Sequence, residues 1–216
     1  IHATGSCSAQ TSRVDSLTAR ADSLFMHGDP AGAKLLYETA LAIDEHKRNA
    51  LLGLGKAFLA LDLWGDAKDS FNAIIDKDTA DIDAHYYAGI AYRETGKTKA
   101  WILRNIDWGN AREEFFWVMR HDSAYLDVFY QYALLMECRK EYPEAITAGH
   151  TQLLQRPDVA QARLGLYRLY RSFVANDRAV AIEWLRKERT PIALYFLADA
   201  PRRDNRLDEA EKLLGE

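Results

Sequence analysis

Cysteine, surplus basic charge and long apolar runs are all scarce in this sequence. Its 216 residues include two cysteines, Cys7 and Cys138, which are too few for a disulfide framework or a four-ligand zinc site. A net charge of −4 argues against general nucleic-acid binding, because that needs surplus lysine and arginine to displace counterions from phosphates. No apolar run approaches the roughly 18 to 20 residues of a membrane-spanning helix. We therefore expect no structural metal, no nucleic-acid partner and no bilayer span.

Catalytic signatures are missing as well. Gly53-Leu54-Gly55-Lys56 looks like part of a phosphate-binding loop, but Ala50 and Ala57 stand where that loop needs a glycine and a serine or threonine. No two histidines have HExxH or His-x-x-His spacing, and no serine lies in a nucleophile elbow. We therefore expect a protein that is not an enzyme and that holds neither a cofactor nor a metal.

What the sequence does contain is a repeat of small side chains in constant register. Residues 51–71 read LLGLGKAFLALDLWGDAKDSF, in which Gly55 precedes an aromatic residue by three positions and Ala67 precedes a phenylalanine by four. The twelve-residue spacing from Gly55 to Ala67 recurs in three further pairs: Ala21 and Ala33, Ala133 and Ala145, Ala198 and Ala210. A period of 34 residues holds over most of the chain. This register indicates a stack of similar structural units.

The pattern resembles the tetratricopeptide repeat, a 34-residue helix-turn-helix unit with L-G-x-x-Y and A-x-x-x-F signatures. The resemblance implies that the small residues lie where paired helices cross most closely. It predicts an all-α, right-handed α-solenoid of about six helical hairpins over residues 14–216. The units are expected at 14–47, 48–81, 82–125, 126–159, 160–190 and 191–216, with an insertion at 97–107 in the third.

Turn residues mark the same boundaries. Pro30 and Pro143 fall where the second helices of two hairpins begin, a position at which the missing N–H has no cost. Gly28 and Gly96 are expected just past first helices, in the left-handed conformation that ends many helices. The sequence stops as the sixth hairpin is completed, without a polar capping helix, so we expect further repeats or another domain beyond residue 216.

Residues 1–13 differ from the repeats and are expected to form a flexible leader or the remnant of an export signal. Ser6-Cys7-Ser8 resembles a bacterial lipoprotein cleavage box with Cys7 as the lipid-bearing residue, although Thr4 stands where leucine is typical. A plain small-x-small cleavage site ending at Ala9, or a leader without function, are the alternatives. A bacterial origin is expected, and an exported, periplasmic or envelope location is as well supported as a cytoplasmic one.

In the family, first helices line the concave face of the superhelix and contact the partner. The resemblance carries this role to Asp22, Phe25, Lys56, Leu59, Tyr86, Ile90, Arg93, Tyr130, Leu134, Glu137, Leu164, Arg168, Arg171, Tyr195 and Arg202. The alternative is that the tyrosines only fill the groove between neighbouring first helices. Asp22 and Lys56 stand where one subgroup has the asparagines of a chaperone carboxylate clamp, which disfavours that adaptor role.

Two further features bear on the partner. Residues 139–206 carry thirteen basic and eight acidic side chains, whereas residues 1–138 carry fourteen and twenty. We therefore expect the groove at Arg168, Arg171 and Arg202 to take an acidic segment. The insertion places Trp101 and Trp108 in a stretch that the repeat does not need. They either form an aromatic lip for a protein, peptide or sugar, or pack over the hairpin.

These features predict a non-catalytic scaffold that binds a protein or peptide, as an extended segment or a helix, on the concave face. The alternative is the regulatory or substrate-recruiting arm of a larger enzyme or envelope protein whose other domain lies beyond residue 216. Membrane contact is expected only through a lipid on Cys7. The oligomeric state does not follow from the sequence.

Overall fold

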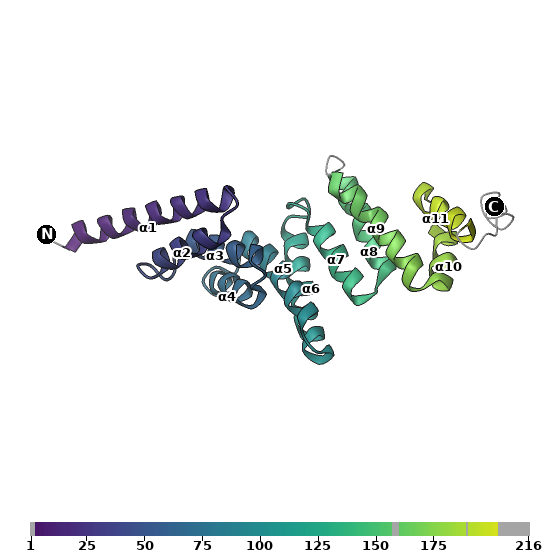
Figure 1. Ribbon diagram of the computed structural model, residues 1–216, viewed down its shortest axis with the longest axis horizontal. Coiled ribbons are helices and arrows are strands. Elements are labelled where there is room, and N and C mark those ends of the chain that lie inside the picture. The colour runs from purple at the N-terminus through teal and green to yellow at the C-terminus, as the bar shows by residue number, and fades with distance from the viewer. Residues whose placement is uncertain (1–2, 157–159, 189, 203–216) are drawn as a thin grey trace. The chain divides into compact units, whose positions relative to one another are not determined.

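The structure is a computed structural model that describes the backbone of residues 3–156, 160–188 and 190–202, and side chains within 10–156, 164–188 and 190–197. Regular structure in these ranges is entirely α-helical (Figure 1). The helices are α1 (Ala3–Met26), α2 (Pro30–Leu41), α3 (Arg48–Ala60), α4 (Trp64–Ile75), α5 (Ile82–Thr98), α6 (Trp101–His121), α7 (Val128–Arg139), α8 (Tyr142–Gln155), α9 (Ala160–Asn176), α10 (Arg178–Glu188) and α11 (Pro191–Arg202). The prediction of an all-α helical repeat is confirmed.

The chain divides into two compact units, Ile1–Asp122 and Ser123–Glu216. In the first unit, α1 and α2, α3 and α4, and α5 and α6 form three hairpins, and each helix packs on the next. The first helices of the hairpins also contact one another in order, α1 with α3 and α3 with α5. This arrangement places one side of α1, α3 and α5 along a common face.

Small residues permit the close packing of the first unit. A Cβ atom on Gly55 would lie 2.5 Å from the ring of Phe71, and one on Gly89 would lie 2.7 Å from the ring of Phe115. Real Cβ atoms do not approach that closely, so these glycines admit the aromatic rings of the following helix. Ala67 and Ala111, one turn before the two phenylalanines, have no exposed surface. The sequence register therefore corresponds to the points where paired helices meet.

The helix ends agree with the sequence in part. Gly28 has a φ of 82° in the turn after α1, as expected. Gly96 instead lies within α5, and its missing side chain makes room for the indole of Trp108, which approaches its Cβ position to 2.5 Å. The expected left-handed cap at Gly96 is therefore wrong, because the extra residues of this hairpin continue as helix. The helices α5 and α6 have 17 and 21 residues, against 13 and 12 in α3 and α4.

Residues 3–13, expected as a leader, form the first turns of α1. Cys7 lies in this helix, but its side chain is outside the described residues. Its lipidation and the export of the chain stay predictions.

The second unit is built in the same way from α7 to α11. Neighbouring helices pack in order, and α9 also contacts α7 and α11. Ala133, Ala145 and Ala181 are completely buried at the crossings. The turn after α7 uses Lys140 in the left-handed conformation, with a φ of 64°. The second helix expected for the last hairpin falls on residues 203–216, outside the described residues.

None of the helices in the described ranges combines the length and the apolarity needed to cross a bilayer.

Candidate functional site

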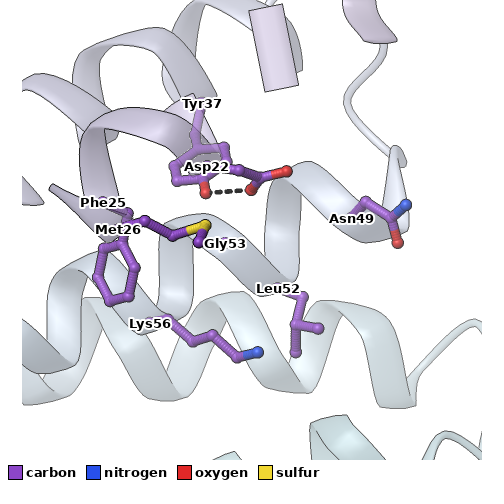
Figure 2. A pocket seen from close by; sticks show the side chains of 8 residues that line it. All are labelled: Asp22, Phe25, Met26, Tyr37, Asn49, Leu52, Gly53 and Lys56. Carbon is purple, nitrogen blue, oxygen red and sulfur yellow. Dashed lines mark hydrogen bonds between the residues drawn. The ribbon is translucent and has the colours of Figure 1, made fainter. Parts of the chain in front are cut away.

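The first unit has a hollow between α1, α2 and α3 with a volume of about 400 Å³. We call it the α1–α3 groove. Its lining residues come from successive turns of α1 and α3, with one from α2: Asp22, Phe25, Met26, Tyr37, Asn49, Leu52, Gly53 and Lys56 (Figure 2). Because residues three or four apart share a helix face, α1 and α3 each present a strip of side chains to this groove.

Tyr37 connects the walls of the groove. Its ring lies against Gly53, where an added Cβ would come within 2.3 Å of Cζ. From there its hydroxyl donates a 2.5 Å hydrogen bond to Oδ1 of Asp22, shown as the dashed line in Figure 2. Burial, together with the hydrogen bond and the negative charge of Asp22, raises the pKa of Tyr37 well above its ordinary value. The phenol therefore stays a donor and holds the Asp22 carboxylate at the groove.

Lys56 supplies a positive charge from α3. Burial lowers the pKa of its ammonium group, an effect that the nearby carboxylates of Asp83 and Asp22 oppose. The ammonium nitrogen lies 4.4 Å from the centroid of the Tyr87 ring, within the range of a cation–π interaction. Lys56 has no ion pair within the described part of the chain. It is a partly desolvated cation that an anionic group can reach.

Apolar surface completes the groove. Leu52 is buried, Phe25 is half-buried, and Met26 is 84% exposed at the rim. Asn49 is exposed and adds a carboxamide, which can both donate and accept hydrogen bonds. The groove thus combines an apolar wall with a carboxylate, an ammonium and an amide. These are the groups that accommodate the side chains and backbone of a peptide.

The second unit has a smaller hollow of about 210 Å³, lined by Tyr130, Leu164, Gly165 and Arg168. Arg168 lies at the surface and pairs with Glu137, with 3.2 Å between its Nη2 and a carboxylate oxygen. A Cβ on Gly165 would fall 2.2 Å from the Tyr130 ring, so this glycine leaves room for that tyrosine. The structure therefore brings together four residues that the sequence placed on the concave face, namely Tyr130, Glu137, Leu164 and Arg168.

Other predicted site residues are placed differently. Tyr86 and Arg93 are each 5% exposed, and Arg93 pairs with Glu94 at 2.9 Å. These two side chains therefore pack within the protein and present little surface to a partner. Ile90 and Leu134 are half-buried, Arg171 and Tyr195 are exposed, and the side chain of Arg202 lies outside the described residues.

The two tryptophans of the insertion have opposite environments. Trp108 is buried against Gly96, and its Nε1 donates to the carbonyl oxygen of Arg93 at 3.2 Å. Trp101 is exposed near the start of α6. Trp108 thus packs over the hairpin, whereas a role of Trp101 in an aromatic lip stays a prediction.

Five residues of the α1–α3 groove were not selected from the sequence: Met26, Tyr37, Asn49, Leu52 and Gly53. One signal for Tyr37 is present, because it follows Ala33 by four positions, where the repeat signature has phenylalanine. An aromatic residue with a hydroxyl at that position can reach a polar group on the neighbouring first helix. Within the described residues, no cluster of three or more His, Cys, Asp or Glu side chains is placed to hold a metal ion.

Comparisons with known proteins support the repeat. The tetratricopeptide repeat family model matches residues 24–97. No curated protein matches the chain. Among solved structures, the tetratricopeptide protein TTC0263 of Thermus thermophilus is similar with a TM-score of 0.67 and 18% identity, covering 94% of this chain and 97% of that one.

Two further structures show the same fold. YrrB, described as a tetratricopeptide protein with an unusual peptide-binding site, has a TM-score of 0.57 and 16% identity, covering 98% of this chain and 97% of its own. PilF of Pseudomonas aeruginosa has a TM-score of 0.62 and 14% identity, covering 95% and 90%. Residues 24–97 therefore carry tetratricopeptide repeats, and the chain has the fold of a tetratricopeptide repeat protein.

Proposed function

We propose that this protein is a non-catalytic interaction scaffold that binds a peptide segment of a partner protein in the α1–α3 groove. The observation that carries this proposal is the composition of the groove, where Asp22 and Lys56 present opposite charges beside the apolar side chains of Phe25, Met26 and Leu52. Stacked helical hairpins offer extended surface for such contacts. YrrB, a tetratricopeptide protein of similar fold with an unusual peptide-binding site, supports the same role.

The groove indicates how the peptide would bind. An apolar side chain of the peptide would pack against Met26 and Phe25, whose exposed surface then leaves water. A backbone N–H or a basic group would donate to the Asp22 carboxylate, which Tyr37 already orients. A carbonyl or carboxylate would accept from Lys56, whose partial desolvation strengthens that contact.

The second unit provides a separate contact for an acidic segment of the partner. Arg171 is exposed, and Arg168 lines the smaller hollow beside Tyr130. A carboxylate of the partner would have to compete with Glu137 for Arg168. This contact is therefore weaker than one made by two arginines without ion-pair partners. Charge reversal at Arg168 and Arg171 should weaken binding of an acidic peptide, whereas an unchanged dissociation constant would exclude this contact.

The main test is selection of binders from a random peptide library, followed by measurement of their dissociation constants. Asp22→Asn keeps an acceptor for Tyr37 but removes the charge, and Lys56→Gln removes the ammonium. Each substitution should raise the dissociation constant of a selected peptide about tenfold or more, because charged hydrogen bonds contribute about 1.5 to 3 kcal/mol.

Matched controls are Asp69→Asn on α4 and Lys187→Gln on α10, whose side chains are 76% exposed and do not line the groove. These controls should leave the dissociation constant unchanged. If no peptide is selected, or if the groove and control variants bind equally, the proposed function is wrong.

A further inference from the structure

An exposed apolar patch lies at the start of α6, outside both hollows. Trp101, Ile102, Leu103 and Ile106 are 68%, 58%, 53% and 56% exposed. Single apolar side chains at a surface are ordinary, but four within six residues of one helix form a patch. Further along the exposed side of α6 stand Asn110 and Glu113, so the patch is confined to the beginning of the helix.

The patch rests on a fixed base. Trp108 and Ala111, on the side of α6 opposite Ile102 and Ile106, are buried against α5, and the Trp108 indole is hydrogen-bonded to the Arg93 carbonyl. Because these contacts orient α6, its first turns cannot rotate to bury Ile102 and Ile106 against α5. The apolar side chains therefore stay directed toward solvent.

Basic side chains lie within and just before the same patch. The segment 97–106, which we call the hairpin tip, contains Lys97, Lys99 and Arg104 and no acidic residue. Lys97 pairs with Glu94 at 2.8 Å and Lys99 with Asp107 at 2.9 Å, both carboxylates lying just outside the tip. The Arg104 guanidinium donates to the carbonyl oxygen of Lys99 and has no carboxylate partner in the described ranges. With these two carboxylates counted, the tip and its ion-pair partners keep one net positive charge, that of Arg104, on a segment, 1–138, whose net charge is negative.

The first turn of α6 adds to this positive potential. Its N-cap residue, Ala100, has no side chain that can accept a hydrogen bond, and the first turn has no acidic residue. The N–H groups at this end therefore lack side-chain acceptors, and the helix dipole makes the end partially positive. Phosphate is a ligand that such an end accommodates.

We propose that the hairpin tip docks on an anionic phospholipid surface. Trp101 lies at the level of the headgroups, where tryptophan is favoured, and Ile102, Leu103 and Ile106 enter the boundary of the acyl chains. Arg104 and the start of α6 face lipid phosphates. The sequence alone predicted membrane contact only through a lipid on Cys7, whereas this contact needs no lipidation.

Charge favours a lipid surface over a second copy of the chain as the occupant. In a symmetric pair the same patch of each copy would meet, so the Arg104 side chains and the positive ends of the two α6 helices would come together and repel. An anionic bilayer instead satisfies the apolar and the cationic parts at once. Since four apolar side chains alone give only weak attachment, binding should require anionic lipid and should weaken with salt.

The test is sedimentation of the purified chain with vesicles of phosphatidylcholine alone or with added phosphatidylglycerol. We expect co-sedimentation only with phosphatidylglycerol, at least tenfold weaker at high salt. Ile102→Ser combined with Ile106→Ser should reduce vesicle binding about tenfold or more. Both residues are exposed, so the fold should be retained. The matched control, Leu35→Ser with Leu154→Ser, changes two exposed leucines elsewhere and should bind as the unchanged chain does.

Fluorescence quenching by brominated acyl chains gives a second measurement. Quenching should be lost in Trp101→Phe and kept in Trp64→Phe. The proposal is overturned if vesicles without phosphatidylglycerol bind equally well, if the double serine variant binds fully, or if Trp101→Phe is quenched as before. It is also overturned if no vesicle binds and sedimentation velocity shows a dimer that the serine variant abolishes.

Discussion

The imidazole of His85 lies between two acceptors, with its Nδ1 2.5 Å from a carboxylate oxygen of Glu114 and its Nε2 3.0 Å from the carbonyl oxygen of Thr79. A neutral imidazole donates from only one nitrogen, so both contacts are hydrogen bonds only when the ring is protonated. The ring also stacks on Trp117, with 3.9 Å between centroids. His85 therefore joins α5 to α6 through a charge.

This arrangement predicts a pH-dependent stability. Burial lowers the pKa of His85, but the hydrogen bonds to Glu114 and Thr79 and the attraction of Glu114 and Asp81 outweigh it, so the pKa is raised above its ordinary value. A raised pKa in the folded state gives stability that is complete below about pH 6.5 and is lost as pH rises through the folded-state pKa. His85→Gln should lower the free energy of unfolding by about 1 to 3 kcal/mol at pH 6 and by less at higher pH.

Urea unfolding at several pH values measures this effect, and His46→Gln is the control because His46 is exposed. An effect of His85→Gln that is independent of pH, or that grows above pH 6.5, would contradict a protonated ring.

His150 in the second unit should respond in the opposite direction. Burial lowers the pKa of His150, and its Nε2 lies 2.8 Å from the hydroxyl of Tyr170. A neutral ring can accept a hydrogen bond from that hydroxyl, whereas a protonated ring cannot. Because the unfolded chain binds a proton more readily, acidification below about pH 6.5 should destabilise this contact. Amide hydrogen exchange should show α8 and α9 becoming less protected at pH 5, and His150→Gln should remove this loss.

Gly53 should not tolerate a side chain. Alanine at this position would place its Cβ 2.3 Å from the Tyr37 ring, which must then move and release Asp22. We expect Gly53→Ala to destabilise the chain by about 1 to 3 kcal/mol in urea unfolding. Gly65→Ala is the control, because its Cβ would meet no atom within 4 Å on α4, and it should be neutral or stabilising by up to about 1 kcal/mol. Equal stability of the two variants would show that the Tyr37 ring can move to accommodate a side chain at position 53 without loss of stability.

Arg48 should be required for the contact between α3 and α5. Its guanidinium lies 2.7 Å from a carboxylate oxygen of Asp81 and 2.5 Å from one of Asp83. Asp81 is buried and also accepts a hydrogen bond from the N–H of Ala84 at the start of α5. Arg48→Gln leaves that carboxylate without its cation and should cost about 1 to 3 kcal/mol in urea unfolding.

Lys68→Gln is the control for Arg48, since Lys68 is 3.8 Å from an exposed Asp69 and such a pair contributes about 0 to 1 kcal/mol. A loss no larger than that of the control would mean that Arg48 contributes little.

The helical hairpins were predictable because helix crossings depend on residue size, and size is visible in the sequence. Gly55 and Gly89 are 34 residues apart and meet Phe71 and Phe115, each of which follows a small residue by four positions. Gly96 shows where this reasoning fails. A glycine is suited both to a left-handed turn and to a close contact between helices. At Gly96 the structure has the close contact because of Trp108, which lies twelve positions away.

The candidate site was predictable only in part. Asp22, Phe25 and Lys56 follow from the phase of the first helices, and the structure places them in the groove. Tyr37 was missed because it belongs to a second helix, and it reaches Asp22 only by passing the bare backbone of Gly53. Tyr86 and Arg93 have the same phase but are covered by neighbouring side chains, since burial depends on the sizes of residues from several helices.

Within each unit, helices pack on the next helix or the next but one along the chain. Contacts between residues near in sequence close small loops, and domains rich in such contacts fold in about microseconds to milliseconds. A hairpin such as α1 and α2 can therefore assemble on the ribosome before the residues of α5 have been synthesised.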